Sequence, residues 1–126
     1  MYPPIFSVCS ADSAVLALLG SNPCRLYPFG EAPQGVLKPY AVWQSVGGGP
    51  ENYLNQIPDM DLWSIQVDVY ADTVDSARLA AQALRDAIEP VAHITSFNGD
   101  GRDPDTNNYR YSFSVDWWVP RDPGST

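Results

Sequence analysis

DLWSIQVDVYADTVDSARLAAQALRDAIE, residues 61–89, is the stretch of sequence that decides the fold of this chain. Apolar and polar residues alternate in its first half, which is typical of a strand with one buried face. The apolar residues of this strand are Trp63, Ile65, Val67 and Val69. In the second half, apolar residues recur every three or four positions, which predicts an amphipathic helix. We expect Asp72 or Thr73 to cap that helix and Pro90 to end it.

Upstream of this unit, the sequence predicts one helix and two strands. Within MYPPIFSVCSADSAVLALLG, we expect a short amphipathic helix with Ser10 as its N-cap and Gly20 as its C-cap. The segment 24–29 is strand-like but contains Pro28, so it is an edge strand or the entry to a loop. The segment 40–46, YAVWQSV, is a second good strand.

Downstream, the sequence predicts two further strands. Residues 91–97 have β-branched positions typical of a strand, and the polar stretch after them, from Asn98, predicts a long turn. The last strand, 109–119, alternates most clearly in the whole chain. Its apolar face consists of Tyr109, Tyr111, Phe113, Val115, Trp117 and Val119.

This order of elements predicts an α+β fold. We expect a mainly antiparallel, mixed sheet of about 4–5 strands, with two helices packed on one face. Residues 1–120 are expected to form a single domain, because a chain of 126 residues has room for one core. Residues 121–126, RDPGST, are expected to be a flexible C-terminal tail.

Composition argues against several classes of partner. The formal net charge is -8, and seven Lys and Arg residues are outnumbered by fifteen Asp and Glu residues. Specific binding to nucleic acid requires clustered basic residues, so none is expected. The apolar run 14–19 is far shorter than the roughly 20 residues that cross a bilayer, so we expect no membrane contact and a cytoplasmic protein. Cys9 and Cys24 are read as free thiols.

Chemical motifs are weak throughout. Residues 98–109 resemble a cation loop, but Arg102 and Tyr109 fall where carboxylates are needed. His93 is the sole histidine, and Gly47–Gly49 is not followed by a helix start with a lysine. The sequence therefore predicts no catalytic residue, no cofactor and no metal site. One alternative stays open: Asp68 and Asp116 could form an acidic pair on neighbouring strands, which would suit a small enzyme.

Apolar residues outside the expected core indicate an interaction surface. Residues 47–60 predict a long loop, which is either a floppy hairpin connection or a segment that orders against a partner. This loop carries Tyr53, Leu54 and Ile57. On the sheet, Trp43, Tyr70 and Trp118 could lie on the face opposite the helices. These six residues are the candidate subunit and tube interface, unless loops of the same chain cover the aromatic ones.

The order PYAVWQSV, a loop rich in Gly and Pro, WSIQVDVYADTVDSARLAAQALRDAIEP, and YRYSFSVDWWV resembles the tail completion, or tail terminator, proteins of long-tailed, siphovirus-type bacteriophages. The likeness covers nearly the whole chain. The residues that match the family signature are Ile65 to Ala71, Ala77, Leu79, Ala80, Leu84, Arg85, Ala87 and Ile88.

This resemblance implies a structural virion protein and not an enzyme. In that family a ring, usually hexameric, sits on the head-proximal end of the tail tube, stops tube growth and docks onto the head-tail connector protein. The implied partners are further copies of the chain, the tail tube protein and the connector protein, with DNA sliding through an acidic channel. The implied location is the virion tail, after assembly in the host cytoplasm. Another head-tail joining protein or a minor tail component is the alternative.

Overall fold

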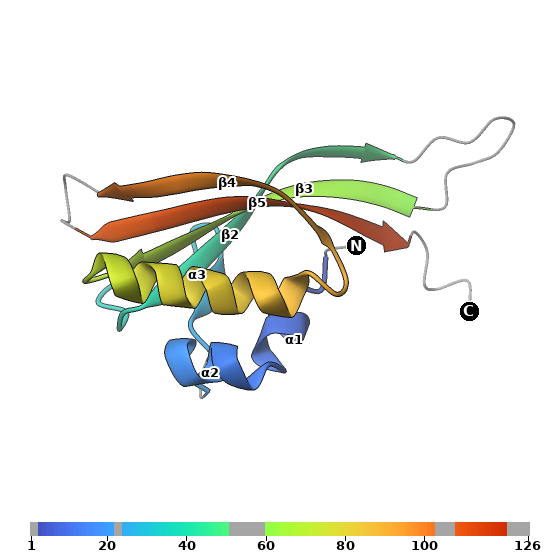
Figure 1. Ribbon diagram of the computed structural model, residues 1–126. Helices are drawn as coiled ribbons and strands as arrows, with labels where there is room; N and C mark the ends of the chain where they lie inside the picture. The colour runs from blue at the N-terminus through green and yellow to red at the C-terminus, as the bar shows by residue number, and fades with distance from the viewer. Residues whose placement is uncertain (1–2, 22–23, 51–59, 103–107, 121–126) are drawn as a thin grey trace, which may run out of the picture.

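The structure, a computed structural model, describes residues 3–21, 24–50, 60–102 and 108–120 (Figure 1). These residues form three helices and five strands. In chain order the elements are α1 (Ile5–Ser10), α2 (Ser13–Leu19), β1 (Leu26–Pro28), β2 (Tyr40–Pro50), β3 (Met60–Ala71), α3 (Val74–Ile88), β4 (His93–Arg102) and β5 (Tyr109–Pro120). The predicted α+β class is confirmed, with three helices in the structure where the sequence predicted two.

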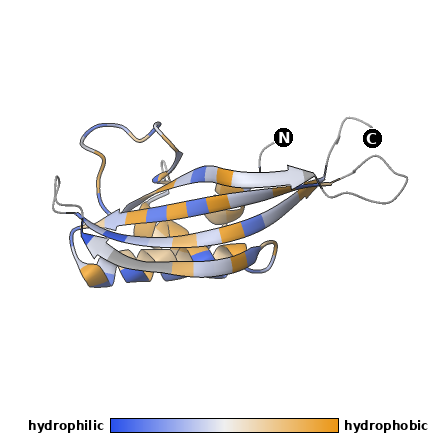
Figure 2. Ribbon diagram, turned by 90° about the horizontal axis from the view of Figure 1, so that it is seen from above, coloured by the Kyte–Doolittle hydropathy of each residue, from blue (hydrophilic) through white to orange (hydrophobic). Residues whose placement is uncertain are grey.

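The five strands form one sheet in the order β1-β2-β3-β5-β4. Only β1 and β2 are parallel, and the other neighbouring strands are antiparallel. All three helices lie on one side of the sheet, with α3 between the sheet and the two short helices (Figure 1). Figure 2 views the sheet from the side that lies away from the helices, where hydrophobic and hydrophilic residues alternate along the strands. The sheet therefore has a helix-covered face and an outer face.

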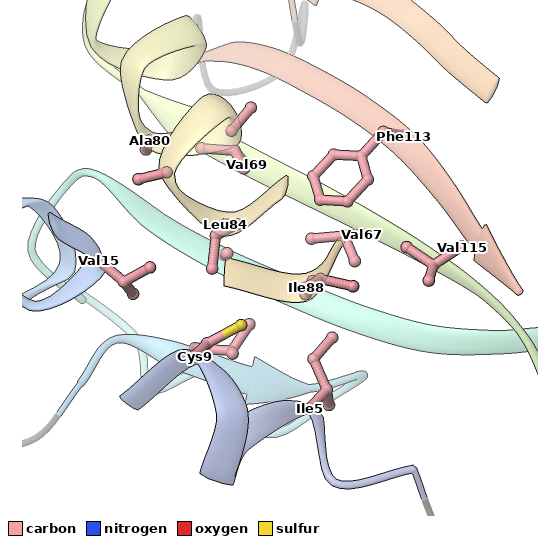
Figure 3. Close-up of a cluster of buried hydrophobic side chains, with 14 of the residues drawn as sticks. Ile5, Cys9, Val15, Val67, Val69, Ala80, Leu84, Ile88, Phe113 and Val115 are labelled. Atoms are coloured by element: carbon pink, nitrogen blue, oxygen red, sulfur yellow. The ribbon is translucent and has the colours of Figure 1, made fainter. Parts of the chain in front are cut away.

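The core lies where β3 and β5 meet α3 (Figure 3). The register pairs Ile65 with Val115 and Val67 with Phe113, so the predicted apolar faces of these two strands coincide. Fully buried residues on the three elements include Ile65, Val67, Val69, Phe113, Val115, Leu84 and Ile88. The short helices add Ile5, Cys9, Val15 and Leu19 to the same cluster.

The start of α3 resolves the choice between two predicted caps. Thr73 is the N-cap, and its hydroxyl oxygen accepts a hydrogen bond of 3.1 Å from the backbone N–H of Ser76. Asp75 lies in the first turn, where a negative charge is favourable. Asp72 instead forms an ion pair of 3.3 Å with Lys38.

The N-terminal helix prediction was wrong in its boundaries, because two short helices replace one. Ser10 is the last residue of α1 and not a cap. Asp12 caps α2, where its carboxylate accepts hydrogen bonds from the backbone N–H groups of Ala14 and Val15 at 2.9 and 3.1 Å. An Asp side chain competes with the helical backbone for these donors, so the helix breaks before Asp12 and restarts after it. Gly20 is the C-cap with φ 86, as predicted.

Two strands extend further than the sequence predicted. Residues 47–50 belong to β2 and pair with 61–64 of β3, although the sequence predicted a loop there. Residues 98–102 belong to β4, although the sequence predicted a turn. Glycine has no side chain to contribute to the hydropathy pattern, but its backbone still pairs with a neighbouring strand. Residues 121–126, the predicted tail, lie outside the described residues.

Gly48 shows why one of these glycines is required. Its φ is +144, and an added Cβ would collide with the backbone carbonyl of Leu62 on β3. A register shift between Ser45 and Gly47 marks a bulge at the same place. Only a residue without a side chain lets β2 approach β3 so closely.

None of the helices in the described parts of the chain is long and apolar enough to cross a membrane.

Candidate interaction surface

The outer face of the sheet has a polar centre. Ser64 donates a hydrogen bond of 3.2 Å to Asp116 across the β3–β5 pair. Next to them along β3, the side-chain amide of Gln66 donates one of 3.0 Å to Asp68. Because these side chains hydrogen-bond to each other, they need fewer hydrogen bonds from a binding partner.

Aromatic side chains lie at both ends of this polar centre. At one end, Tyr40 of β2 stacks on Tyr70 of β3, with ring centroids 5.2 Å apart and an interplanar angle of 22°. At the other end, Trp118 of β5 pairs with Leu62 of β3 and is 40% exposed. The structure therefore confirms that Tyr70 and Trp118 lie on the outer face, far apart along the strands.

The environment of Tyr70 raises the pKa of its phenol above the ordinary value of 10.0. Partial burial is the largest cause, and the negative charge of Asp68 acts in the same direction. The positive charge of Arg110 and its hydrogen bond with the phenol oppose these effects. Tyr70 thus remains neutral over a wider pH range than a tyrosine in water.

The predicted position of Trp43 on the outer face was wrong. The β2–β3 register pairs Trp43 with Val67, whose side chain is fully buried on the helix-covered face. Trp43 is half-buried and packs against the core cluster. The segment Tyr40–Val46 contains apolar residues on both faces, so its alternation did not decide which face was core.

The remaining candidate residues, Tyr53, Leu54 and Ile57, lie outside the described residues. Residues of β2 and β3, which precede and follow these positions in the sequence, line a pocket of about 350 Å³. Its walls are Ser45, Gly47, Gly48, Gly49, Asp61, Leu62 and Trp63.

The acidic pair considered from the sequence is not formed. Asp68 pairs across the strands with Ser112, whereas Asp116 pairs with Ser64. The two carboxylates are therefore offset by four residues along the sheet, or roughly 13 Å at 3.3 Å per residue. This distance is too long for two carboxylates to share a proton or act on one bond.

The two cysteines are free and buried, as the sequence predicted. Burial is the main cause that raises the pKa of the Cys9 thiol to about 12, and the charges of Cys24 and Asp12 add to it. Because the thiolate is the reactive form, Cys9 is held in its inert form.

The sequence did not predict a pocket that lies over Asp68 on the outer face. It has a volume of about 270 Å³ and is lined by Phe29, Gly30, Ala32, Tyr40, Val42, Gln44, Asp68, Tyr70 and Asn108. Asp68 and Asn108 are each only 7% exposed, although alternation placed Asp68 on the solvent side. The signal that was available is the run Tyr27-Pro28-Phe29-Gly30, in which a proline and a glycine turn the chain directly after β1.

Comparison with solved structures supports the fold. A chain from the structure "Virion of native gene transfer agent (GTA) particle" matches with a TM-score of 0.63 and 17% sequence identity. The match covers 92% of this chain and 91% of that chain. At this level of identity the likeness concerns the fold.

No curated protein matches this sequence. The family model for "Tail completion protein gp17" matches residues 3–120, which include every helix and strand described above. This chain belongs to the tail completion protein gp17 family.

Proposed function

We propose that this protein forms a ring, hexameric in its assembled state, that caps the head-proximal end of a phage tail tube. The ring ends polymerisation of the tube protein and provides the surface on which the head-tail connector protein docks. The observation that carries this proposal is the family match over residues 3–120. The protein accordingly acts in the virion tail, after assembly in the host cytoplasm.

The distribution of apolar side chains supports a ring. A closed ring requires a heterologous interface, in which two different patches of one subunit meet. Trp118, 40% exposed on the outer face, offers an apolar contact on one side of the sheet. Leu79 on α3, 56% exposed, offers another on the side of the helices. A subunit with unlike contacts on its two sides can bind a neighbour on each.

The charge of the chain supports a channel for DNA. With a formal net charge of -8, the subunits of a ring repel the phosphate backbone. DNA then passes through the channel without being held by its walls. Neither specific nucleic-acid binding nor membrane binding is part of this proposal.

Tube polymerisation in the presence of the purified protein tests the proposal. Tube protein is polymerised with increasing amounts of this chain, and tube lengths are measured by electron microscopy. We expect shorter tubes with a ring-shaped density at one end. Tube lengths that do not change, together with light scattering that shows a monomer at every concentration, would refute the proposal. Binding to connector rings without any effect on tube length would favour a head-tail joining protein instead.

A further inference from the structure

The pocket over Asp68 contains a buried negative charge with few partners. Asp68 is 7% exposed, and Gln66 donates the one hydrogen bond that its carboxylate forms with described residues. A carboxylate removed from water to this extent is costly unless a positive charge or several donors compensate.

Four basic side chains in the described part of the chain interact with groups outside this pocket. Lys38 pairs with Asp72, and Arg85 pairs with Asp86 and Glu89. Arg25 donates to the backbone carbonyls of Leu18 and Pro39, and Arg102 lies over the ring of Tyr109 at 5.2 Å.

Arg110 is the described cation nearest to the pocket in the register. It stands opposite Tyr70 on β5 and hydrogen-bonds the Tyr70 phenol. It forms no ion pair with Asp68 within the described residues. Among the residues that the structure describes, no cation therefore forms an ion pair with Asp68.

A neighbouring polar group has no hydrogen-bond partner among the described residues. The hydroxyl oxygen of Ser112, which is paired with Asp68 across the strands, is buried and has no hydrogen-bond partner among the described residues. Ser112 itself is 4% exposed. Ser112 does not belong to the lining of the pocket, so its buried hydroxyl adds an unsatisfied polar group beneath this part of the face and not a contact for a ligand.

The walls of the pocket have the chemistry that binds an organic cation. Three aromatic rings, those of Phe29, Tyr40 and Tyr70, line it beside the carboxylate. The faces of aromatic rings attract a cation placed over them, and a planar guanidinium group both stacks on a ring and donates to a carboxylate. The side-chain amide of Gln44 adds an acceptor oxygen.

A metal ion suits this pocket less well than an organic cation. Within the described residues, no group of three or more His, Cys, Asp and Glu side chains comes together. Among the described residues of the lining, Asp68 is the single carboxylate, whereas Ca²⁺ and Mg²⁺ sites normally combine several oxygen ligands and more than one negative charge.

We propose that the pocket over Asp68 binds the guanidinium group of an arginine that a neighbouring protein of the tail presents. The source of that arginine rests on the proposed function, but the chemistry of the pocket does not. The carboxylate of Asp68 accepts N–H donors of the guanidinium group, and the rings of Phe29 and Tyr70 lie against its faces. The outer face of the sheet then contributes one charged anchor to assembly in addition to its apolar contacts.

A small probe tests the pocket without any assembly. The folded full chain is titrated with N-acetyl-arginine amide, and nuclear magnetic resonance signals of Tyr40 and Tyr70 are followed. We expect saturable shifts at these residues, and no saturable shift with N-acetyl-citrulline amide, which has nearly the same shape but no charge. Saturable binding of the citrulline probe with the same affinity would overturn the proposal.

Variants separate Asp68 from the general acidity of the face. Asp68→Asn should weaken binding of the arginine probe by roughly tenfold or more, since it removes a charge-assisted hydrogen bond. The matched control is Asp116→Asn, which removes the same charge from the same face outside the pocket and should leave the affinity unchanged. Equal affinities for both variants would contradict the proposal.

Two further variants keep the test decisive. Phe29 is 71% exposed, so Phe29→Ala should fold normally and weaken probe binding by roughly threefold through the loss of one ring. This result holds even if Asp68→Asn fails to fold. If the probe binds Arg110→Ala but not the wild type, the chain's own arginine fills the pocket and the proposal is overturned.

The two proposals fail separately. Probe binding that depends on Asp68, combined with unchanged tube lengths, would refute the capping function and keep the arginine pocket. Shortened tubes with no binding of the arginine probe would keep the capping function and refute the arginine pocket.

Discussion

Two leucines on α3 test how much a single side chain contributes to this core. Leu84 is fully buried against the sheet, whereas Leu79 on the same helix is 56% exposed. Leu84→Ala should lower the free energy of unfolding by about 2 to 5 kcal/mol, because it removes buried methyl groups and leaves a cavity. Leu79→Ala should change it by less than about 0.5 kcal/mol. Chemical denaturation of both variants measures the difference, and similar costs for the two would mean that the buried face of α3 is misassigned.

Tyr70 makes stability depend on pH in the alkaline range. Its pKa is raised above 10.0, mainly by burial, so the folded protein disfavours the phenolate more than the unfolded chain does. The resulting stabilisation is fully present below pH 10 and is lost as the pH rises through the folded pKa.

Tyr70→Phe should therefore flatten the decline of stability above pH 10. Denaturation midpoints measured at several alkaline pH values check this expectation. A wild type and a variant with parallel pH profiles would show that Tyr70 does not titrate differently in the two states.

At the residue scale, the sequence correctly predicted which side chains of a strand face the core where apolar and polar residues alternate over a long stretch. The faces of β3 and β5 were correct because polar and apolar residues alternate strictly over residues 64–69 and 110–117. Trp43 was misplaced because Ala41, Val42 and Trp43 are all apolar, and only pairing with β3 shows which of them is core. The burial of Asp68 was not predictable from its own strand, because it depends on a distant segment around Phe29 that lines the same pocket.

At the scale of elements, two adjacent glycines on β2 differ in their requirements. An Ala at Gly48 would place its Cβ against the Leu62 carbonyl in a backbone region that L-residues rarely adopt. Gly49 has open space for a Cβ and an ordinary φ. Gly48→Ala should therefore cost roughly 1 to 3 kcal/mol, whereas Gly49→Ala should be neutral or slightly stabilising.

Thermal unfolding of the two glycine variants distinguishes these expectations. Both variants replace a glycine by alanine at adjacent positions, so each variant is the control for the other. Equal losses of stability would mean that the close approach of β2 to β3 does not depend on Gly48.

Element boundaries were the least predictable feature of the fold, and the reasons are local. Hydropathy predicted α3 well, because its stripe is continuous and Thr73 and Pro90 flank it. Hydropathy missed the break between α1 and α2, because the carboxylate of Asp12 and not an apolar pattern sets it. It also missed the ends of β2 and β4, where glycines pair through their backbone alone.

At the scale of the whole molecule, Trp118 tests whether the outer face mediates assembly. It is 40% exposed, so Trp118→Ser removes part of a buried apolar contact and should lower the stability of the monomer without unfolding it. If the outer face forms a subunit or tube contact, the variant should lose ring formation and no longer shorten tubes, since a buried Trp contributes strongly to an interface.

Circular dichroism checks whether this variant folds, and electron microscopy of tube polymerisation reactions measures its assembly. The exposed residue Leu37, at 72% exposure in the segment between β1 and β2, offers a matched control as Leu37→Ser. Normal capping by Trp118→Ser would place the assembly contacts elsewhere on the subunit.

The position of β5 in the sheet determines when the outer face can form during synthesis. The last strand of the chain lies between β3 and β4, and it supplies Trp118. Because the ribosome adds residues in order, a nascent chain that ends before Tyr109 has β3 and β4 without the strand that joins them. The surface that we assign to assembly therefore forms only after β5 has been synthesised. If our proposal holds, a chain that stops before β5 should be unable to cap a tube.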